Sequence, residues 1–166
     1  MKQGPEPARQ LERTQILAVD YGRVRIGLAI ADATTQLSRP LATLQRINRN
    51  EDMRRLRELV REHSVKQIVV GLPLRLDGTR GEMAEEAERF ALRAAKQIGV
   101  PVELVDERLT SWEAERLMDE TFGRVSHKGD RTKGTSTAGG ASVDAVAAAV
   151  ILKEYLERGQ SREQDG

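Results

Sequence analysis

The apolar positions of the chain first form short continuous runs, each closed by turn residues or charges. Runs of this length between turn residues are typical of buried strands. They predict strands at residues 16–20, 26–30, 41–47, 67–70 and 102–105. Only a tight turn around Gly22 separates the first two runs, so these strands should form an antiparallel hairpin.

Other segments repeat apolar residues every three or four positions, which is the period of a helix that buries one face. Helices are predicted at residues 50–63, at 83–98, from 111, and at 143–157. Asn50 should cap the first helix, whose balanced charges should form a solvated face, and Ser142 should cap the last. Gly99 and Pro101 should end the second helix. The last helix is apolar nearly all round, which predicts burial against the sheet.

The order of these elements indicates one α/β domain. A hairpin and a third strand come first, and the later strands alternate with helices, which forces parallel pairing. We therefore expect a mixed five-stranded sheet with helices on both faces, spanning residues 14–157 of the 166. Residues 1–13 should form a disordered arm, and residues 158–166 a polar tail.

The composition narrows the range of partners. The chain has no cysteine, which excludes disulfides, thiolate zinc sites and cysteine nucleophiles, and favours a reducing cytoplasm. Its longest apolar run, residues 145–152, is far shorter than the roughly 18 residues of a membrane span, so no membrane partner is expected. The net charge is only +1 and aromatic residues make up 3% of the chain. Any contact with nucleic acid should therefore involve phosphates rather than base stacking.

Acidic residues stand where the predicted elements should bring them together. Asp20 ends the first strand, Asp106 and Glu107 follow the fifth, and Asp144 opens the last helix. Sites in open α/β sheets form at the carboxyl ends of parallel strands, within reach of such a helix. Converging ionised carboxylates need a cation, and oxygen ligands favour Mg²⁺ or Mn²⁺ in a site for one or two ions. Ions held in this way activate water for attack on a phosphodiester.

Each acid also has a purely structural explanation. Asp20 could begin the turn that follows it, and Asp144 could complement the positive end of its helix dipole. Asp106 or Glu107 could be a surface charge at the end of a strand, and spacing alone does not decide which of the two faces the site. The hypothesis of a catalytic site rests on the coincidence of all three positions in this strand order.

Residues 122–142 are rich in glycine, serine and threonine and have almost no apolar anchor. Basic residues are spread through this segment: Arg124, Lys128, Arg131 and Lys133. The segment is either a flexible connector or a basic flap that closes on the phosphates of a polyanion. The second alternative follows from its position between the helix after Glu107 and the helix of Asp144.

Four motifs of the chain resemble those of the YqgF/RuvX family. They lie at residues 17–22 with 26–27, at 69–74 with 77–79, at 106–111, and at 143–145. One such motif is weak evidence, whereas four in the same order are specific. With the Ala-rich helix after the last motif, the resemblance covers about residues 16–156.

This resemblance implies an RNase H-like fold, close to that of Holliday junction resolvases. The family is described as nucleases that mature the 5′ end of pre-16S rRNA and as Holliday junction resolvases. The resemblance implies that Asp20, Glu107 and Asp144 are the catalytic and metal-binding acids, which decides the choice left open after the fifth strand. It also implies that Arg108 and Thr110 face phosphates. Members often carry a basic residue just ahead of the third acid, and this chain has none there.

The leading hypothesis is a metal-dependent nuclease acting on structured or single-stranded RNA, or on branched DNA, as a monomer or a homodimer. The alternative is a non-catalytic RNA-binding factor of ribosome assembly, favoured by the low net charge and the missing basic residue. An actin-like phosphotransferase is a third hypothesis, because an Asp-x-Gly turn also opens its phosphate loop. Such enzymes clamp nucleotide between two domains, whereas this chain supplies one.

Overall fold

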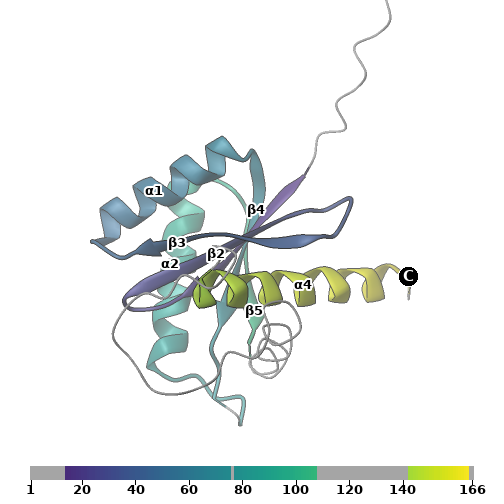
Figure 1. Cartoon of the computed structure of the whole chain (residues 1–166). Coiled ribbons are helices and arrows are strands. Elements are labelled where there is room, and N and C mark those ends of the chain that lie inside the picture. Colours follow the sequence, from purple (N-terminus) through teal and green to yellow (C-terminus); the bar gives the residue numbers. More distant parts are fainter. Residues whose placement is uncertain (1–13, 76, 108–141, 165–166) are drawn as a thin grey trace, which may run out of the picture.

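A five-stranded mixed sheet forms the centre of the protein in the computed structural model, which describes residues 14–75, 77–107 and 142–164 (Figure 1). Its strands are β1 (Gln15–Tyr21), β2 (Arg25–Asp32), β3 (Ser38–Gln45), β4 (Val65–Leu72) and β5 (Val102–Asp106). They lie in the order β3-β2-β1-β4-β5. β2 pairs antiparallel with β1 and β3, whereas β4 pairs parallel with β1 and β5. The predicted mixed sheet is confirmed.

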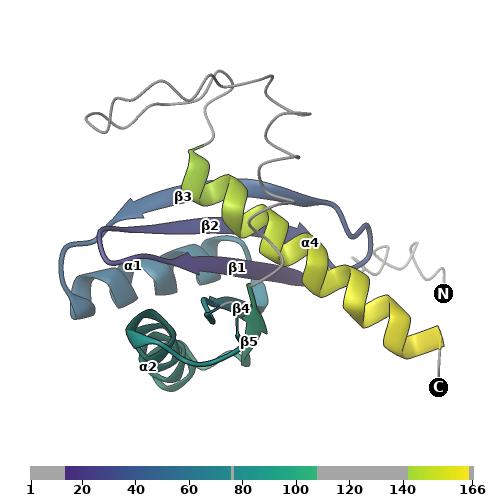
Figure 2. The same ribbon diagram turned by 90° about the horizontal axis from the view of Figure 1, so that it is seen from below.

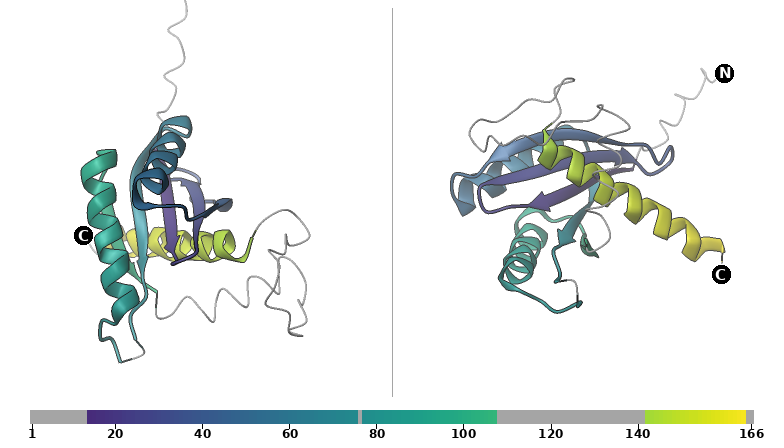
Figure 3. Two further views of the ribbon diagram at one scale, coloured as in Figure 1. Left: turned by 90° about the vertical axis from the view of Figure 1, so that its left-hand side faces the viewer. Right: turned by 60° about the horizontal axis from the view of Figure 1, so that its bottom comes forward.

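Helices cover both faces of the sheet, as predicted. α1 (Arg49–Glu62) and α2 (Glu82–Ile98) lie on one face. α4 (Val143–Gln164) crosses the other face over β1, β2 and β3 (Figure 2; Figure 3). None of the helices in the described residues is long and apolar enough to span a membrane.

The two faces follow from the alternation of side chains along β1. Leu17 and Val19 are fully buried in the core with α1 and α2, whereas Ala18 is fully buried in the core with α4. Because successive side chains of a strand point to opposite faces, Asp20 belongs to the α4 face. Tyr21 packs against the core of α1 and α2. The same strand end therefore supplies one polar side chain to each face.

Strand β3 begins earlier than predicted, because the sheet edge accommodates a proline. The sequence predicts this strand over residues 41–47, but it spans Ser38–Gln45. The register of its pairing with β2 shifts at Pro40, where Leu41 is an extra residue in a β-bulge. Proline is tolerated at edge strands and bulges, since it has no N–H to donate to the ladder.

The N-terminus of α1 also differs from the prediction. Asn48 rather than Asn50 is the cap: its side chain accepts a hydrogen bond from the N–H of Glu51 at 2.8 Å. Its carbonyl accepts the first helical bond, from the N–H of Asp52 at 2.9 Å. Asp52 itself is only 2% exposed and pairs with Arg46. The expected solvated face is therefore wrong at Asp52, which turns inward to this partner.

Helix α4 is longer than predicted. Ser142 caps it as expected, with its hydroxyl accepting a hydrogen bond from the N–H of Ala145 at 3.2 Å. The helix was expected to end at Glu157 but continues to Gln164, through most of the segment assigned to a polar tail. The residues that extend it include Arg, Glu and Gln, which are good helix formers. The arm at 1–13 and the helix predicted from residue 111 lie outside the described residues.

Helix α4 lies close against the sheet at Gly27 in β2. A Cβ at Gly27 would overlap the carbonyl oxygen of Asp144, in the first turn of α4. The same helix is held along β3 by the hydroxyl of Ser38, which donates to the carbonyl of Ala149 at 3.0 Å. The absence of a side chain at Gly27 thus sets how near α4 lies to the hairpin.

We expect Gly27→Ala to push α4 away from the sheet and to lower the free energy of unfolding by about 1–3 kcal/mol, the usual cost of overpacking. Urea unfolding followed by circular dichroism would measure the change. Gly159→Ala is the matched control, because Gly159 is an exposed residue of α4 with nothing near its Cβ position. It should stabilise the protein by up to about 1 kcal/mol. Equal effects of the two changes would contradict the close approach.

Candidate active site

Asp20 and Asp144 meet where α4 crosses the hairpin of β1 and β2. Asp20 lies near the end of β1, directly opposite Gly27 in the sheet register. Because Gly27 has no side chain, the first turn of α4 lies against it, and this turn carries Asp144. The negative charge of Asp144 is near enough to raise the pKa of Asp20.

Glu107 reaches the same place from the end of β5. Its N–H donates to the carbonyl of Leu72 at 3.1 Å, which continues the parallel pairing with β4. A Cβ at Gly71 in β4 would overlap the Glu107 carboxylate, so this side chain lies across β4. There it forms a hydrogen bond with Asp20. The structure therefore brings together Asp20, Glu107 and Asp144, the three acids singled out from the sequence.

Burial and mutual repulsion disfavour the charged forms of two of these carboxyl groups. Burial, followed by the charge of Asp144, raises the pKa of Asp20 to about 6. Burial, followed by the charge of Asp20, raises the pKa of Glu107 to about 8. The hydrogen bond between the two carboxyl groups requires a proton on one of them. Carboxyl groups whose crowding keeps a proton on them near neutral pH also favour the binding of a cation.

Arg25 is a residue of this site that sequence reasoning missed. It is the first residue of β2, and its Nε donates to Oδ2 of Asp144 at 2.9 Å. The two residues are 119 positions apart, so a basic side chain reaches the third acid from another element rather than from just ahead of it. In this arrangement Asp144 faces Arg25 while Asp20 and Glu107 face each other. Among residues 14–75, 77–107 and 142–164, no three His, Asp or Glu side chains are placed to hold a metal ion.

The two glycines of the site were missed as well, although the sequence contained a signal for them. Gly27 and Gly71 each interrupt an apolar strand, and an isolated glycine in a strand often marks a close approach. Asp106, the other acid of this region, is the last residue of β5 and adds to the raised pKa of Glu107. The predicted phosphate contacts lie outside the described residues: Arg108, Thr110, Arg124, Lys128, Arg131 and Lys133.

The donors of this site suit a hard divalent cation. All three side chains offer carboxylate oxygens, the ligands that Mg²⁺ and Mn²⁺ prefer. Gly27 and Gly71 let the first turn of α4 and the Glu107 carboxylate lie against the sheet beside Asp20. A rotation of Asp144 away from Arg25 would add its oxygens to those of the other two acids. The donor chemistry therefore fits such an ion, although the three side chains are not arranged around one common point in this structure.

The strand order, with acids gathered beside β1 and a helix crossing the hairpin, defines an RNase H-like fold. The RuvC protein of T. thermophilus in complex with a Holliday junction substrate has this fold, with a TM-score of 0.55. The two chains are 16% identical, and the match covers 89% of this chain and 96% of that one. The chain belongs to the RuvX family, since its residues 14–158 match the family model described as Holliday junction resolvase.

Relatives of this chain are similar over most of their length. A protein of Anaeromyxobacter sp. (strain K), named "Putative pre-16S rRNA nuclease", is 45% identical over 143 residues, or 86% of this chain and 96% of that protein. A protein of Koribacter versatilis with the same name is 38% identical over 151 residues, or 90% and 92% of the two chains. The resemblance drawn from the four motifs is confirmed, and with it the class of nuclease.

The raised pKa values predict how the stability of the metal-free protein depends on pH. The folded protein keeps a proton on Glu107 that the unfolded chain loses above its ordinary pKa of 4.5. The free energy of unfolding should therefore fall as the pH rises from about 4.5 to about 8. Asp20→Asn removes one of the repelling charges, so it should raise the free energy of unfolding at pH 8 by roughly 1–2 kcal/mol.

Urea unfolding in EDTA at a series of pH values would measure this effect. Glu103→Gln is the control, because Glu103 is an exposed carboxylate of the same strand as Asp106. A difference between wild type and Asp20→Asn that does not widen from pH 5 to pH 8 would count against the raised pKa values.

Proposed function

We propose that this protein is a metal-dependent nuclease that hydrolyses phosphodiester bonds in nucleic acid and acts in the 5′-end processing of pre-16S rRNA. The observation that carries the proposal is the meeting of Asp20, Glu107 and Asp144 beside β1, with raised pKa values at two of them. Membership of the RuvX family and the names of its relatives support the same activity. The absence of cysteine fits a place of action in the reducing cytoplasm.

Asp20, Glu107 and Asp144 are the residues that would hold one or two Mg²⁺ or Mn²⁺ ions. Ions bound there supply an activated water and stabilise the leaving oxygen of a phosphodiester. The chain itself fixes the carboxylates: β1 and β5 present two of them from a rigid sheet. Gly27 lets α4 present the third. Cations held there would offset the repulsion among the three acids.

Arg25 supplies a positive charge beside these acids. It pairs with Asp144 at 2.9 Å while its side chain remains 50% exposed. If Asp144 served as a metal ligand, Arg25 would be free to meet a substrate phosphate, which its guanidinium can bind with two N–H groups. Arg25 would then serve in place of the basic residue that the family often carries ahead of the third acid. Arg108, Thr110 and the basic residues of 122–142 would add further phosphate contacts.

Resolution of Holliday junctions is a second candidate function, favoured by the description of the RuvX family. A resolvase cuts two strands symmetrically and so requires a two-fold dimer. A nuclease that processes an RNA end can act as a monomer. A non-catalytic RNA-binding factor differs from both, because its binding would not need Asp20.

We expect Asp20→Asn, Glu107→Gln and Asp144→Asn each to reduce cleavage in Mg²⁺ or Mn²⁺ at least about 100-fold, as for the loss of one electrostatic contact to a transition state. Asp106→Asn is the matched control and should retain most of the activity, since Asp106 only neighbours Glu107. Side-by-side assays on precursor 16S rRNA, single-stranded RNA and a four-way DNA junction would measure cleavage. Sedimentation of the same samples would give the oligomeric state.

The outcomes of these assays separate the candidates. Cleavage that persists in Asp20→Asn would contradict the proposed metal site. If the wild type cut none of the substrates and Asp20→Asn bound RNA unchanged, the protein would be an assembly factor. Preference of a monomer for precursor RNA would support rRNA processing, and symmetric cutting of the junction by a dimer would support resolution.

Arg25→Gln should separate substrate binding from metal binding. The KM for nucleic acid should rise about tenfold, because a charged phosphate contact is lost. The metal concentration for half-maximal activity should fall, because a cation has been removed from beside Asp144. Arg39→Gln is the control, since Arg39 is exposed on β3. A metal requirement that rises in Arg25→Gln would show that Arg25 does not compete with the metal.

A further inference from the structure

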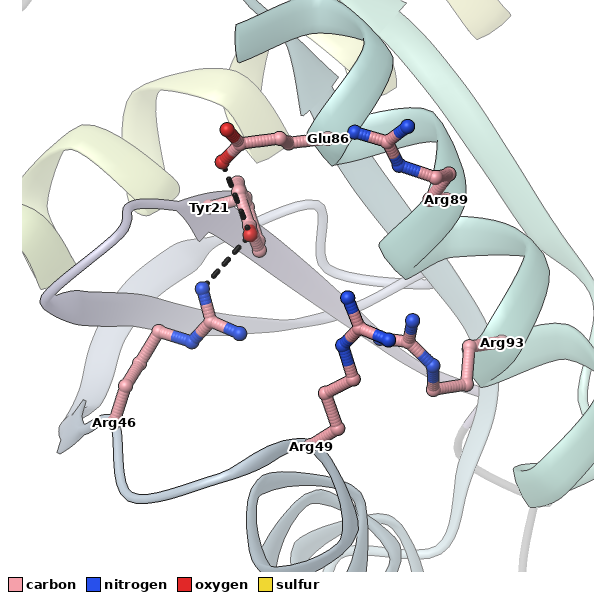
Figure 4. Close-up of a pocket in the computed structure, with 6 residues that line it drawn as sticks. All are labelled: Tyr21, Arg46, Arg49, Glu86, Arg89 and Arg93. Carbon is pink, nitrogen blue, oxygen red and sulfur yellow. Dashed lines mark hydrogen bonds between the residues drawn. The ribbon is translucent and has the colours of Figure 1, made fainter.

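A second polar site lies on the other face of the sheet, away from the acids. A pocket of about 240 Å³ opens between the end of β1, the start of α1 and the side of α2 (Figure 4). Its lining consists of Tyr21, Arg46, Arg49, Glu86, Arg89 and Arg93. Four of these six side chains carry guanidinium groups. None of the six residues belongs to the proposed metal site.

Asp20 and Tyr21 connect the two sites. They are consecutive residues of β1, so their side chains point to opposite faces of the sheet. Asp20 joins the acids near α4, whereas the Tyr21 ring lies in the core of α1 and α2, 5.2 Å from the ring of Phe90. The pocket and the candidate active site therefore lie back to back across one strand end.

Two charges of the pocket already have partners. Arg46 pairs with the buried Asp52 at 3.2 Å and lies over the Tyr21 ring, 4.9 Å from its centroid. Glu86 pairs with Arg23 of the β1–β2 turn at 2.9 Å and accepts a hydrogen bond from the Tyr21 hydroxyl. These contacts, drawn in part in Figure 4, hold the walls of the pocket in place.

Two arginines of the pocket, Arg49 and Arg93, remain without such a partner. Within the described ranges, no carboxylate lies within 4.0 Å of a guanidinium nitrogen of either residue. Arg89 instead adds, after Arg23, to the positive charge that lowers the pKa of Glu86. Arg49 is the first residue of α1, where the helix dipole also favours an anion. Arg89 and Arg93 lie one turn apart on α2. Figure 4 shows Arg49 and Arg93 pointing toward each other from the two helices, an arrangement that repels unless an anion lies between them.

The shape and lining of the pocket suit a phosphate group rather than a nucleotide base. Pockets for small organic ligands usually have about 300–1,000 Å³ and mostly apolar walls. This pocket is smaller, at about 240 Å³, and its lining is almost entirely charged. The one aromatic ring in its lining, that of Tyr21, is covered by Arg46 and packs on Phe90, so a base could not stack on it freely. Guanidinium groups match the oxygens of a phosphate.

We propose that this pocket binds a phosphate group of the nucleic acid substrate. The nucleic acid chain would continue from the active site past the β1–β2 turn to reach it. The inference rests on the proposed function, since it takes the substrate to be a nucleic acid. The nucleic acid would then contact the protein on both faces of the sheet. Arg25 would bind it on one side of the hairpin, and Arg49 and Arg93 on the other. A free nucleotide offers the same phosphate chemistry, and the experiment distinguishes it from the substrate strand.

The test is a binding measurement on the full chain in EDTA, so that cleavage is not required. Fluorescence anisotropy of a labelled single-stranded RNA over a range of salt concentrations would give the affinity and its salt dependence. Arg49→Gln with Arg93→Gln should weaken binding about tenfold and reduce the slope of log K against log salt by about one, the loss of one phosphate contact. Arg49→Lys with Arg93→Lys keeps the charges but not the forked donors of the guanidinium groups. Its affinity for RNA should therefore lie between those of the wild type and of the Gln double variant.

The matched control is Arg61→Gln with Lys96→Gln. It removes the same charge from the same two helices, at exposed positions outside the pocket lining. It should keep the wild-type salt slope. Calorimetry with inorganic phosphate and with adenosine monophosphate, on the wild type and these three double variants, tests the free nucleotide as the source of the phosphate.

Each outcome decides a part of the inference. An equal loss of RNA affinity in the two Gln double variants would overturn it, because only general attraction to basic helices would then be seen. If the pocket variant lost phosphate and adenosine monophosphate but bound RNA unchanged, the ligand would be a free nucleotide and not the substrate strand. If the wild type bound RNA through the pocket but cut nothing, the proposed nuclease activity would be contradicted. The proposed phosphate binding by the pocket would still be supported. If the wild type cut RNA and the pocket variant bound RNA as the wild type does, only the proposed phosphate binding by the pocket would be contradicted.

Discussion

The candidate site depends on keeping two carboxyl groups, those of Asp20 and Glu107, side by side in a largely buried position. Burial and repulsion keep a proton between them near neutral pH, at a cost in folding free energy. The apolar cores on both faces of the sheet offset this cost, because they hold β1 and β4 firmly beneath the acids. Two glycines, Gly27 and Gly71, make the crowding possible, since each leaves room for a neighbouring acid where a side chain would stand. Natural sites often hold such locally unfavourable arrangements for the sake of function.

Much of the fold could be predicted from the sequence, because short apolar runs and helical periods reflect burial directly. The sheet, its mixed pairing and the helices on both faces are confirmed. The ends of elements were less predictable, since they depend on single hydrogen bonds or bulges. The cap of α1 at Asn48 and the start of β3 ahead of Pro40 are examples. The end of α4 at Gln164 was missed because nothing apolar marks it.

The candidate site could be predicted only in part. Asp20 and Asp144 could be singled out because one ends an apolar run and the other directly precedes one, where a charge is costly without a role. The choice of Glu107 over its neighbour came from the family resemblance, since spacing left both open. Arg25 could not be found, because its contact with Asp144 is made by the tertiary packing of α4 on the hairpin. The arginines that line the pocket beside Tyr21 were equally hidden, since in sequence they resemble any solvated charge.

The bulge at Pro40 has a consequence for how copies of this chain could associate. β3 is an outer strand of the sheet, and outer strands can recruit a strand from another molecule through their unpaired N–H and C=O groups. A proline and a bulge in the middle of β3 break that row of groups and alter the local twist. Lateral growth of the sheet across this edge is therefore disfavoured, and a two-fold assembly able to cut paired strands would have to join through other surfaces.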